Sequence, residues 1–167
     1  GAVCASGGSV TLTETGILDA IKSGNYTYID RMIPELTQEQ REEAMRAAFS
    51  ADVYLASANA ITENGELYNV DGNGNRVAAT VFGPDSVVVI AGMNKVMDTL
   101  DEAIRRARTV AAPLNQQRFL LDNPCSVTGT CADCKSLTCI CNQILITRNC
   151  RPAGRIKFVL IGEDLGL

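Results

Sequence analysis

The chain has 167 residues, a formal net charge of −4 and a pI of about 4.8. This length suits one domain with a sizeable core, and a hydrophobic content of 46% is typical of a globular chain rather than a disordered one. The acidic balance and the absence of Trp argue against a nucleic-acid-binding protein, and no apolar stretch reaches the roughly 18 residues that a membrane helix needs.

Apolar periodicity divides the chain into alternating strands and helices. In chain order, the pattern predicts a strand at 3–5, helices at 11–22 and 37–50, a strand at 53–57, a hairpin of 66–70 with 76–81, a strand at 87–91, a helix at 96–111, and strands at 144–147 and 156–162. Thr11 and Glu14 have the spacing of a capping box at the start of the first helix. Thr37 and Gln40 repeat that spacing at the start of the second. Residues 71–74, Asp-Gly-Asn-Gly, supply the positive φ that a tight hairpin turn requires.

The helix at 96–111 has the clearest helical pattern. An apolar stripe marks one side, and the charge pairs Asp101–Arg105 and Glu102–Arg106 predict a solvated opposite side. Pro113 is expected to end this helix. The alternation of strands and helices predicts an α/β fold with a mainly parallel sheet and helices on both faces.

Ligand-binding residues are expected in loops that follow strands, because open α/β sheets bind ligands at the carboxyl ends of their strands. The first such loop is Gly7-Gly8-Ser9, whose glycines let the backbone approach a ligand, although packing explains them equally well. The second loop carries Asn59, Thr62 and Glu63. We expect Asn59 and Thr62 to bind a polar ligand and Glu63, if buried, to serve as a catalytic acid or base. An ordinary turn, with these side chains bonded to their own backbone, is the alternative.

The third loop contains Asn94 and Lys95, between the strand at 87–91 and the next helix. Lys95 beside a helix start suits a carboxylate or a phosphate, and a solvent-exposed lysine is the alternative. The hairpin tip adds Asp71, Asn75 and Arg76 as candidate ligand-binding residues, and Arg76 suits an anion. The chain has no His, which excludes Ser-His-Asp and Cys-His catalysis.

Five of the seven cysteines fall between Cys125 and Cys141. Cys131 and Cys134 form a C-x-x-C pair with Cys125 and Cys141 on either side, and four thiolates suit zinc or an iron–sulfur cluster. The spacing matches neither the usual zinc ribbon nor the common ferredoxin pattern, so reduced cysteines in a compact loop remain the alternative. The N-terminus lacks a secretory signal, and the cytoplasm is the expected compartment.

Segments along the whole chain, in order, carry a family signature. They are residues 7–12, 59–67, 71–77, 92–95, 111–115, 124–125, 128–129, 131–136, 140–142 and 162–166. Together these segments resemble the motifs of the LUD (lactate-utilisation) domain family. The resemblance covers residues 1–167 as a single domain.

The resemblance implies a Rossmann-like three-layer α/β sandwich, similar to the superfamily of ribose isomerases, glucosamine deaminases and CoA transferases. It also implies a bacterial accessory subunit of L-lactate oxidation to pyruvate, which binds a small organic-acid or phosphate-bearing ligand and works beside iron–sulfur oxidoreductase subunits. The alternatives are an isomerase-like or CoA-transferase-like enzyme that uses Glu63, and a cysteine–metal module that docks an electron-transfer partner.

Two departures from the family pattern bear on these expectations. The family usually has another strand and helix before the Gly7-Gly8-Ser9 motif, so the chain is either a fragment or a short form truncated at its N-terminus. A homodimer that covers the exposed sheet edge is then expected. Cys139 stands where the family usually has Arg, which adds a fifth thiol near the predicted metal site.

Overall fold

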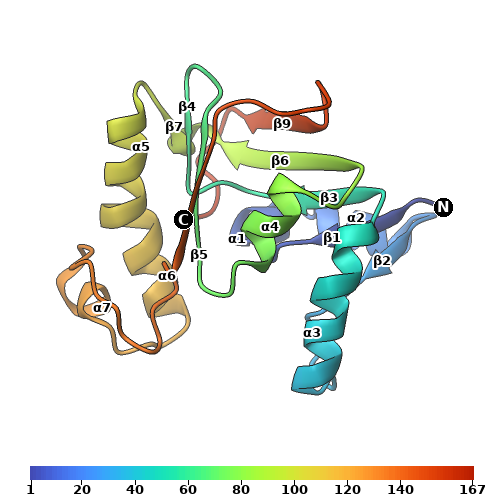
Figure 1. Ribbon diagram of the computed structural model, residues 1–167, viewed down its shortest axis with the longest axis horizontal. Coiled ribbons are helices and arrows are strands. Elements are labelled where there is room, and N and C mark those ends of the chain that lie inside the picture. Colours follow the sequence, from blue (N-terminus) through green and yellow to red (C-terminus); the bar gives the residue numbers. More distant parts are fainter.

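The computed structural model describes residues 1–167 and contains two sheets (Figure 1). The larger sheet has five parallel strands in the order β2-β1-β3-β6-β9. Its strands are β1 (Val3–Ser6), β2 (Thr27–Ile29), β3 (Val53–Ala56), β6 (Ser86–Gly92) and β9 (Ile156–Ile161). The smaller sheet is mixed, in the order β7-β4-β5-β8. Its strands are β4 (Ala60–Thr62), β5 (Leu67–Asp71), β7 (Val96–Met97) and β8 (Gln143–Thr147).

Seven α-helices and three shorter helical turns complete the chain. The α-helices are α1 (Val10–Glu14), α2 (Ile17–Ser23), α3 (Gln38–Ala47), α4 (Asn75–Val81), α5 (Leu100–Arg106), α6 (Ala112–Arg118) and α7 (Pro124–Thr128). The shorter turns are η1 (Ala48–Ser50), η2 (Met93–Lys95) and the π-helical η3 (Ala107–Ala111). None of these helices combines the length and apolar character that crossing a membrane requires.

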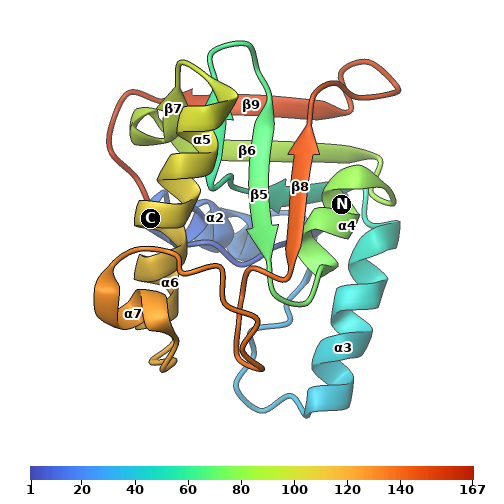
Figure 2. The same ribbon diagram turned by 60° about the vertical axis from the view of Figure 1, so that its left-hand side comes forward.

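Three hydrophobic clusters hold the layers together. On one face of the parallel sheet, Leu55 and Ile90 pack against Leu12 of α1 and its neighbours. On the other face, a cluster that includes Tyr54 joins the sheet to α4, η1 and the smaller sheet. A third cluster, which includes Tyr68, packs the smaller sheet on α5. Figure 2 shows β5 and β8 running across β6 and β9, with α5 and α6 to one side. The fold is therefore a three-layer α/β sandwich with an added sheet.

Several predicted elements are confirmed. The strand predicted at 87–91 is β6, which hydrogen-bonds to a parallel neighbour on each side. The predicted capping box is present: the Gln40 N–H donates to Thr37 Oγ1 at 3.2 Å, and the Thr37 N–H donates to Gln40 Oε1 at 2.9 Å.

The predicted hairpin of 66–70 with 76–81 is wrong. Its first strand is β5, but β5 pairs with β4 and β8, and residues 75–81 form the helix α4. The glycine-rich turn of residues 71–74 leads into the first turn of α4 and does not connect two strands. Gly74 precedes the helix with a φ of 85°, and the Asp71 carboxylate accepts the backbone N–H groups of Arg76 and Val77 at 2.9 and 3.2 Å. The carboxylate thus caps α4.

Both other predicted helices need correction. The helix at 11–22 is split into α1 and α2 at Gly16, and Ser9 rather than Thr11 precedes its first turn, so the Thr11–Glu14 capping box is absent. The helix at 96–111 begins at Leu100 and does not end at Pro113, since η3 and α6 continue to Arg118. The π-helical turn changes the hydrogen-bond spacing just before Pro113, where an N–H is missing.

Candidate functional site

A small polar cleft lies beside the carboxyl ends of β1, β3 and β6, as expected for an open parallel sheet. Its volume is about 50 Å³, room for a few water-sized groups. The polar side chains that line it come from five parts of the chain: Ser9, Ser57, Asn59, Arg76, Lys95, Asn115 and Arg118. Gly8 and Leu167 also line the cleft. The structure therefore brings together the predicted residues Gly8, Ser9, Asn59, Arg76 and Lys95.

Lys95 is the most buried charged residue of the cleft, with 3% of its surface exposed. Its Nζ donates to Thr11 Oγ1 at 2.9 Å and to Ser57 Oγ at 3.2 Å. Burial, followed by the positive charges of Arg106 and Arg76, lowers the pKa of Lys95 to about 8. The alternative of a solvent-exposed lysine is therefore wrong.

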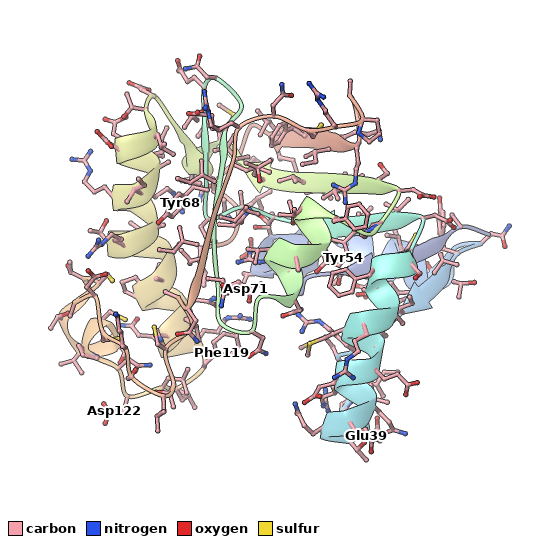
Figure 3. The ribbon with its side chains drawn as sticks, in the orientation of Figure 1. Glu39, Tyr54, Tyr68, Asp71, Phe119 and Asp122 are labelled. Atoms are coloured by element: carbon pink, nitrogen blue, oxygen red, sulfur yellow. The ribbon has the colours of Figure 1, made fainter.

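Arg76 reaches the cleft from the first turn of α4. Its Nη2 donates to Asn59 Oδ1 at 3.3 Å and to the carbonyl oxygen of Val70. Its side chain also packs on Gly7, where a Cβ would come within 2.9 Å of two Arg76 carbons. Asp71, which Figure 3 shows at the end of β5, caps α4 and so positions Arg76 without reaching its guanidinium. Gly7 and Asp71 thus support the cleft rather than line it.

Arg106 was predicted to face solvent with Glu102, and this is wrong. Only 8% of its surface is exposed. Its Nε donates to the Asn94 carbonyl at 2.8 Å, and its Nη1 donates to the carbonyls of Asn59 at 2.7 Å and Leu167 at 3.3 Å. Arg106 therefore joins two of the predicted ligand loops to the end of the chain.

Residues 163–167, which we call the C-terminal strap, close one side of the cleft. The Met93 N–H donates to the Glu163 carbonyl at 3.1 Å, and the Leu165 N–H donates to Asn94 Oδ1 at 3.1 Å. The Gly166 N–H donates to Glu14 Oε2 at 2.6 Å. Asn94 was predicted to bind ligand, and in the structure its side chain holds the strap.

The cations of the cleft have no acidic partner. The protein has five ion pairs, and none of them includes Arg76, Lys95, Arg106 or Arg118. Of the nearby acids, Asp71 and Glu14 accept backbone N–H groups instead, and Asp164 lies near Arg106 without forming an ion pair with it. The cleft is therefore cationic in a protein whose net charge is −4, and an anion would find several unpaired positive charges there.

The structure does not bring Thr62, Glu63 or Asn75 into the cleft. Glu63 is exposed in the turn between β4 and β5. Thr62 is buried, but its Oγ1 accepts the Glu66 N–H at 3.0 Å and so stabilises that same turn. Asn75 begins α4 and does not line the cleft. The burial that a catalytic role of Glu63 requires is absent.

A second cavity, which we call the cysteine cavity, lies between the smaller sheet and the segment after α6. It is lined by five thiols and by Tyr68 among other residues; the thiols are those of Cys125, Cys131, Cys134, Cys139 and Cys141. Figure 3 shows the sulfur atoms gathered near α7, below Tyr68. All seven cysteines of the chain are free of disulfides.

Burial and the neighbouring thiols shift the pKa values in this cavity. Burial first, and then the other thiols, raise the pKa of Cys141 to about 12 and also raise the pKa values of Cys125 and Cys139. Hydrogen bonds from the backbone and side chain of Ser136 lower the pKa of Cys134. The cavity therefore holds one thiol that ionises readily among several that resist ionisation.

The thiols do not fit a metal in this arrangement. No group of three or more Cys, Asp or Glu side chains converges in a way that would hold a metal ion. The four cysteines predicted as ligands share a cavity, but the geometry of a zinc or iron–sulfur site is not formed. The predicted metal stays a prediction.

Comparison with known proteins gives a family match over nearly the whole chain. A family model described as "LUD domain" matches residues 1–161. A solved structure described as a DUF162 family protein from Deinococcus radiodurans is 16% identical, with 96% of this chain and 88% of that chain covered and a TM-score of 0.42. The structure of eIF2B delta from Chaetomium thermophilum is 22% identical over 57% of this chain and 43% of that chain, with a TM-score of 0.33. No curated protein matches the chain.

Proposed function

The chain belongs to the LUD domain family, and we propose that its cationic cleft binds a small organic anion during bacterial lactate utilisation. The role is that of an accessory subunit in the oxidation of L-lactate, or of a related organic acid, to pyruvate. The family supports the metabolic setting, and the cleft supports the class of ligand.

The observation that carries the proposal is the set of cations without acidic partners. Three of them, Arg76, Lys95 and Arg118, line the cleft directly. Lys95 is buried and Arg76 is partly buried, whereas Arg118 is exposed. An unpaired charge at a buried position is costly, and an anionic ligand would offset that cost for Lys95 and Arg76. The volume of about 50 Å³ has room for a ligand group of a few heavy atoms.

The side chains also suggest how a carboxylate would bind. A guanidinium presents parallel N–H groups that match the two oxygens of a carboxylate, and Arg76 supplies such a group from the first turn of α4. The Lys95 ammonium has three N–H donors, of which two are used by Thr11 and Ser57. The third is free for the ligand.

Calorimetric titration tests the proposal. Lactate, pyruvate and inorganic phosphate are each titrated into the protein, and saturable binding of at least one organic acid is expected. Arg76→Gln should weaken binding by about tenfold or more, because a charge-assisted bond contributes on the order of 1.5–3 kcal/mol. Arg105→Gln is the control, since Arg105 is exposed and pairs with Glu102 outside the cleft. No binding of any organic acid, alone or with partner subunits, would exclude the proposal.

The cysteine cavity supports a second candidate, the metal module. Its supporting observation is that five thiols face one volume, and its weakness is the absence of a ligating arrangement. Elemental analysis of anaerobically purified protein tests it. Near-stoichiometric iron or zinc that disappears in Cys131→Ser and Cys134→Ser would establish a site, whereas folded protein without metal would eliminate this candidate.

A further inference from the structure

The surroundings of Lys95 are those of a reactive amine as well as those of an anion-binding cation. The side chain is almost fully buried yet lines the cleft, and its nitrogen contacts two hydroxyl groups and no carboxylate. A lysine used only to neutralise an anion gains nothing from such burial, because burial disfavours the charged form. Desolvation and neighbouring cations are the conditions that turn a lysine into a nucleophile.

We propose that Lys95 forms a reversible imine with a 2-oxo acid whose carboxylate binds to the cations of the cleft. This inference rests on the proposed function, because it assumes that the cleft binds a small carboxylate. It goes further in naming the ligand class: the ligand carries a ketone next to its carboxylate. A 2-hydroxy acid such as lactate has the same carboxylate but has no carbonyl that an amine attacks.

The hydrogen bonds of the nitrogen leave one direction open. Of the four tetrahedral directions at Nζ, Cε occupies one, and the contacts with Thr11 Oγ1 and Ser57 Oγ occupy two more. The fourth carries a third N–H in the ammonium and the lone pair in the amine. Both hydroxyl contacts persist after deprotonation, because an amine retains two N–H donors. The neutral form is therefore held in place for attack.

The C-terminal strap passes close to this nitrogen at Gly166. A Cβ at Gly166 would lie 2.9 Å from Lys95 Nζ and 2.2 Å from Thr11 Oγ1, and the φ of this residue is +67°. Any side chain at this position would collide with the amine and its hydroxyl partner. Glycine avoids that collision and keeps the strap close to the cleft.

The charged groups around Lys95 favour the neutral amine. Arg76 from α4 and Arg106 from α5 lower its pKa, and Glu14 from α1 raises it by a smaller amount than burial lowers it. With a pKa of about 8, roughly a tenth of the side chains are neutral near pH 7. For an unperturbed lysine near pH 7, the protonated form outnumbers the neutral form by about 2,500 to one.

The step balances without any other reactant. The amine nitrogen attacks the ketone carbon and forms a C–N bond, and the carbonyl oxygen takes up a proton to give a carbinolamine. The C–O bond then breaks, the oxygen leaves as water with both hydrogens of the amine, and a C=N bond remains. Nothing is oxidised or reduced, and hydrolysis returns the free lysine and the 2-oxo acid.

Reductive trapping tests the inference. The full-length protein is incubated with pyruvate and sodium cyanoborohydride, and intact mass and peptide mapping locate the product. One pyruvate-derived adduct on Lys95 is expected, with none on the exposed Lys135 and Lys157 at the same pyruvate concentration. Lys95→Arg, which keeps the positive charge, should lose the adduct completely. Arg76→Gln should need about tenfold more pyruvate for equal trapping, because it loses the carboxylate partner.

Calorimetry with lactate separates failure of the imine from failure of the proposed function. If lactate and pyruvate both bind but pyruvate leaves no adduct on Lys95, the imine is excluded and the anion cleft stands. If neither acid binds and no adduct forms, both proposals fail. Equal adducts on Lys95, Lys135 and Lys157 would also overturn the inference, because they would show ordinary lysine chemistry without a site.

Discussion

Lys95 should give the two proposed activities of the cleft opposite responses to pH. Anion binding uses the ammonium, whereas imine formation uses the amine. As the pH rises through the pKa of about 8, lactate affinity should therefore fall while the rate of pyruvate trapping rises. Calorimetry measures how the lactate affinity changes with pH, and trapping at the same pH values measures how the rate of pyruvate trapping changes. In Lys95→Arg the lactate affinity should lose this pH dependence, and parallel slopes in the wild type would contradict the assignment.

The same residue predicts a change of stability with pH. Between the folded pKa of about 8 and the ordinary lysine pKa of 10.5, the unfolded chain binds more protons at Lys95 than the folded chain does. The contribution of Lys95 to the free energy of unfolding should therefore increase as the pH rises through this window. Urea unfolding of the wild type and of Lys95→Met measures this contribution. The difference in the free energy of unfolding between the two proteins should narrow or reverse as the pH approaches 10.5.

The thiols of the cysteine cavity should react in a defined order. Cys134 and Cys141 are both half-buried, but the pKa of Cys134 is lowered by Ser136 whereas that of Cys141 is raised to about 12. Because the thiolate is the nucleophile, iodoacetamide near neutral pH should modify Cys134 first and Cys141 last. A time course followed by peptide mass spectrometry gives the order. Equal rates at the two sites would refute this reading of the cavity.

At the level of single residues, the sequence predicted part of the cleft. Ser9, Asn59 and Lys95 were found because the carboxyl ends of parallel strands share one edge of a sheet. Arg106 was missed because its spacing from Glu102 matches a solvent-exposed ion pair. Its position between the buried residues Ala103 and Ala107 was the available signal. Glu63 was wrongly predicted to reach the cleft because the sequence does not show that the short strand β4 follows β3. That strand carries Glu63 into the exposed turn before β5.

Among the elements, α3 offers a direct test of helix capping. Thr37→Ala removes the side-chain acceptor of the Gln40 N–H and should lower the free energy of unfolding by about 1 kcal/mol. Thr109→Ala is the matched control, since Thr109 is exposed inside a helix and caps nothing. Urea denaturation of both variants gives the comparison. Equal losses would show that the capping box contributes nothing specific.

The failure to predict α4 has a physical explanation at this level. Val77, Ala79 and Val81 alternate with polar or small residues, which favours a strand. The Asp71 carboxylate, however, caps two N–H groups at the helix start, and Ala79 joins the core between the sheets. Residues 75–81 fit both a strand and a helix locally, and the tertiary contacts favour the helix. The smaller sheet was not predicted because β4 and β7 have only three and two residues, which is too short for a periodic pattern.

For the molecule as a whole, Arg155 links the last strand to the middle of the chain. It precedes β9, and its guanidinium donates to the carbonyls of Thr80, Ala79 and Pro84 at 2.7, 3.1 and 3.0 Å. Arg155→Gln should lower the free energy of unfolding by on the order of 2 kcal/mol. Arg46→Gln, at an exposed and weakly paired position, should change it by less than about 1 kcal/mol. Thermal and urea unfolding compare the two variants, and equal effects would contradict the role given to Arg155.

The contact between Glu14 and Gly166 joins residues 152 positions apart, and it closes the site at Lys95. A ribosome makes Glu14 well before Gly166, and domains form as their residues emerge from it. The nascent protein can therefore build β1, β3 and most of the parallel sheet while its binding site is still open on one side. The contact with Glu14 forms only after Gly166 has been synthesised, so the side of the cleft that residues 163–167 cover is completed later than the sheet beneath it.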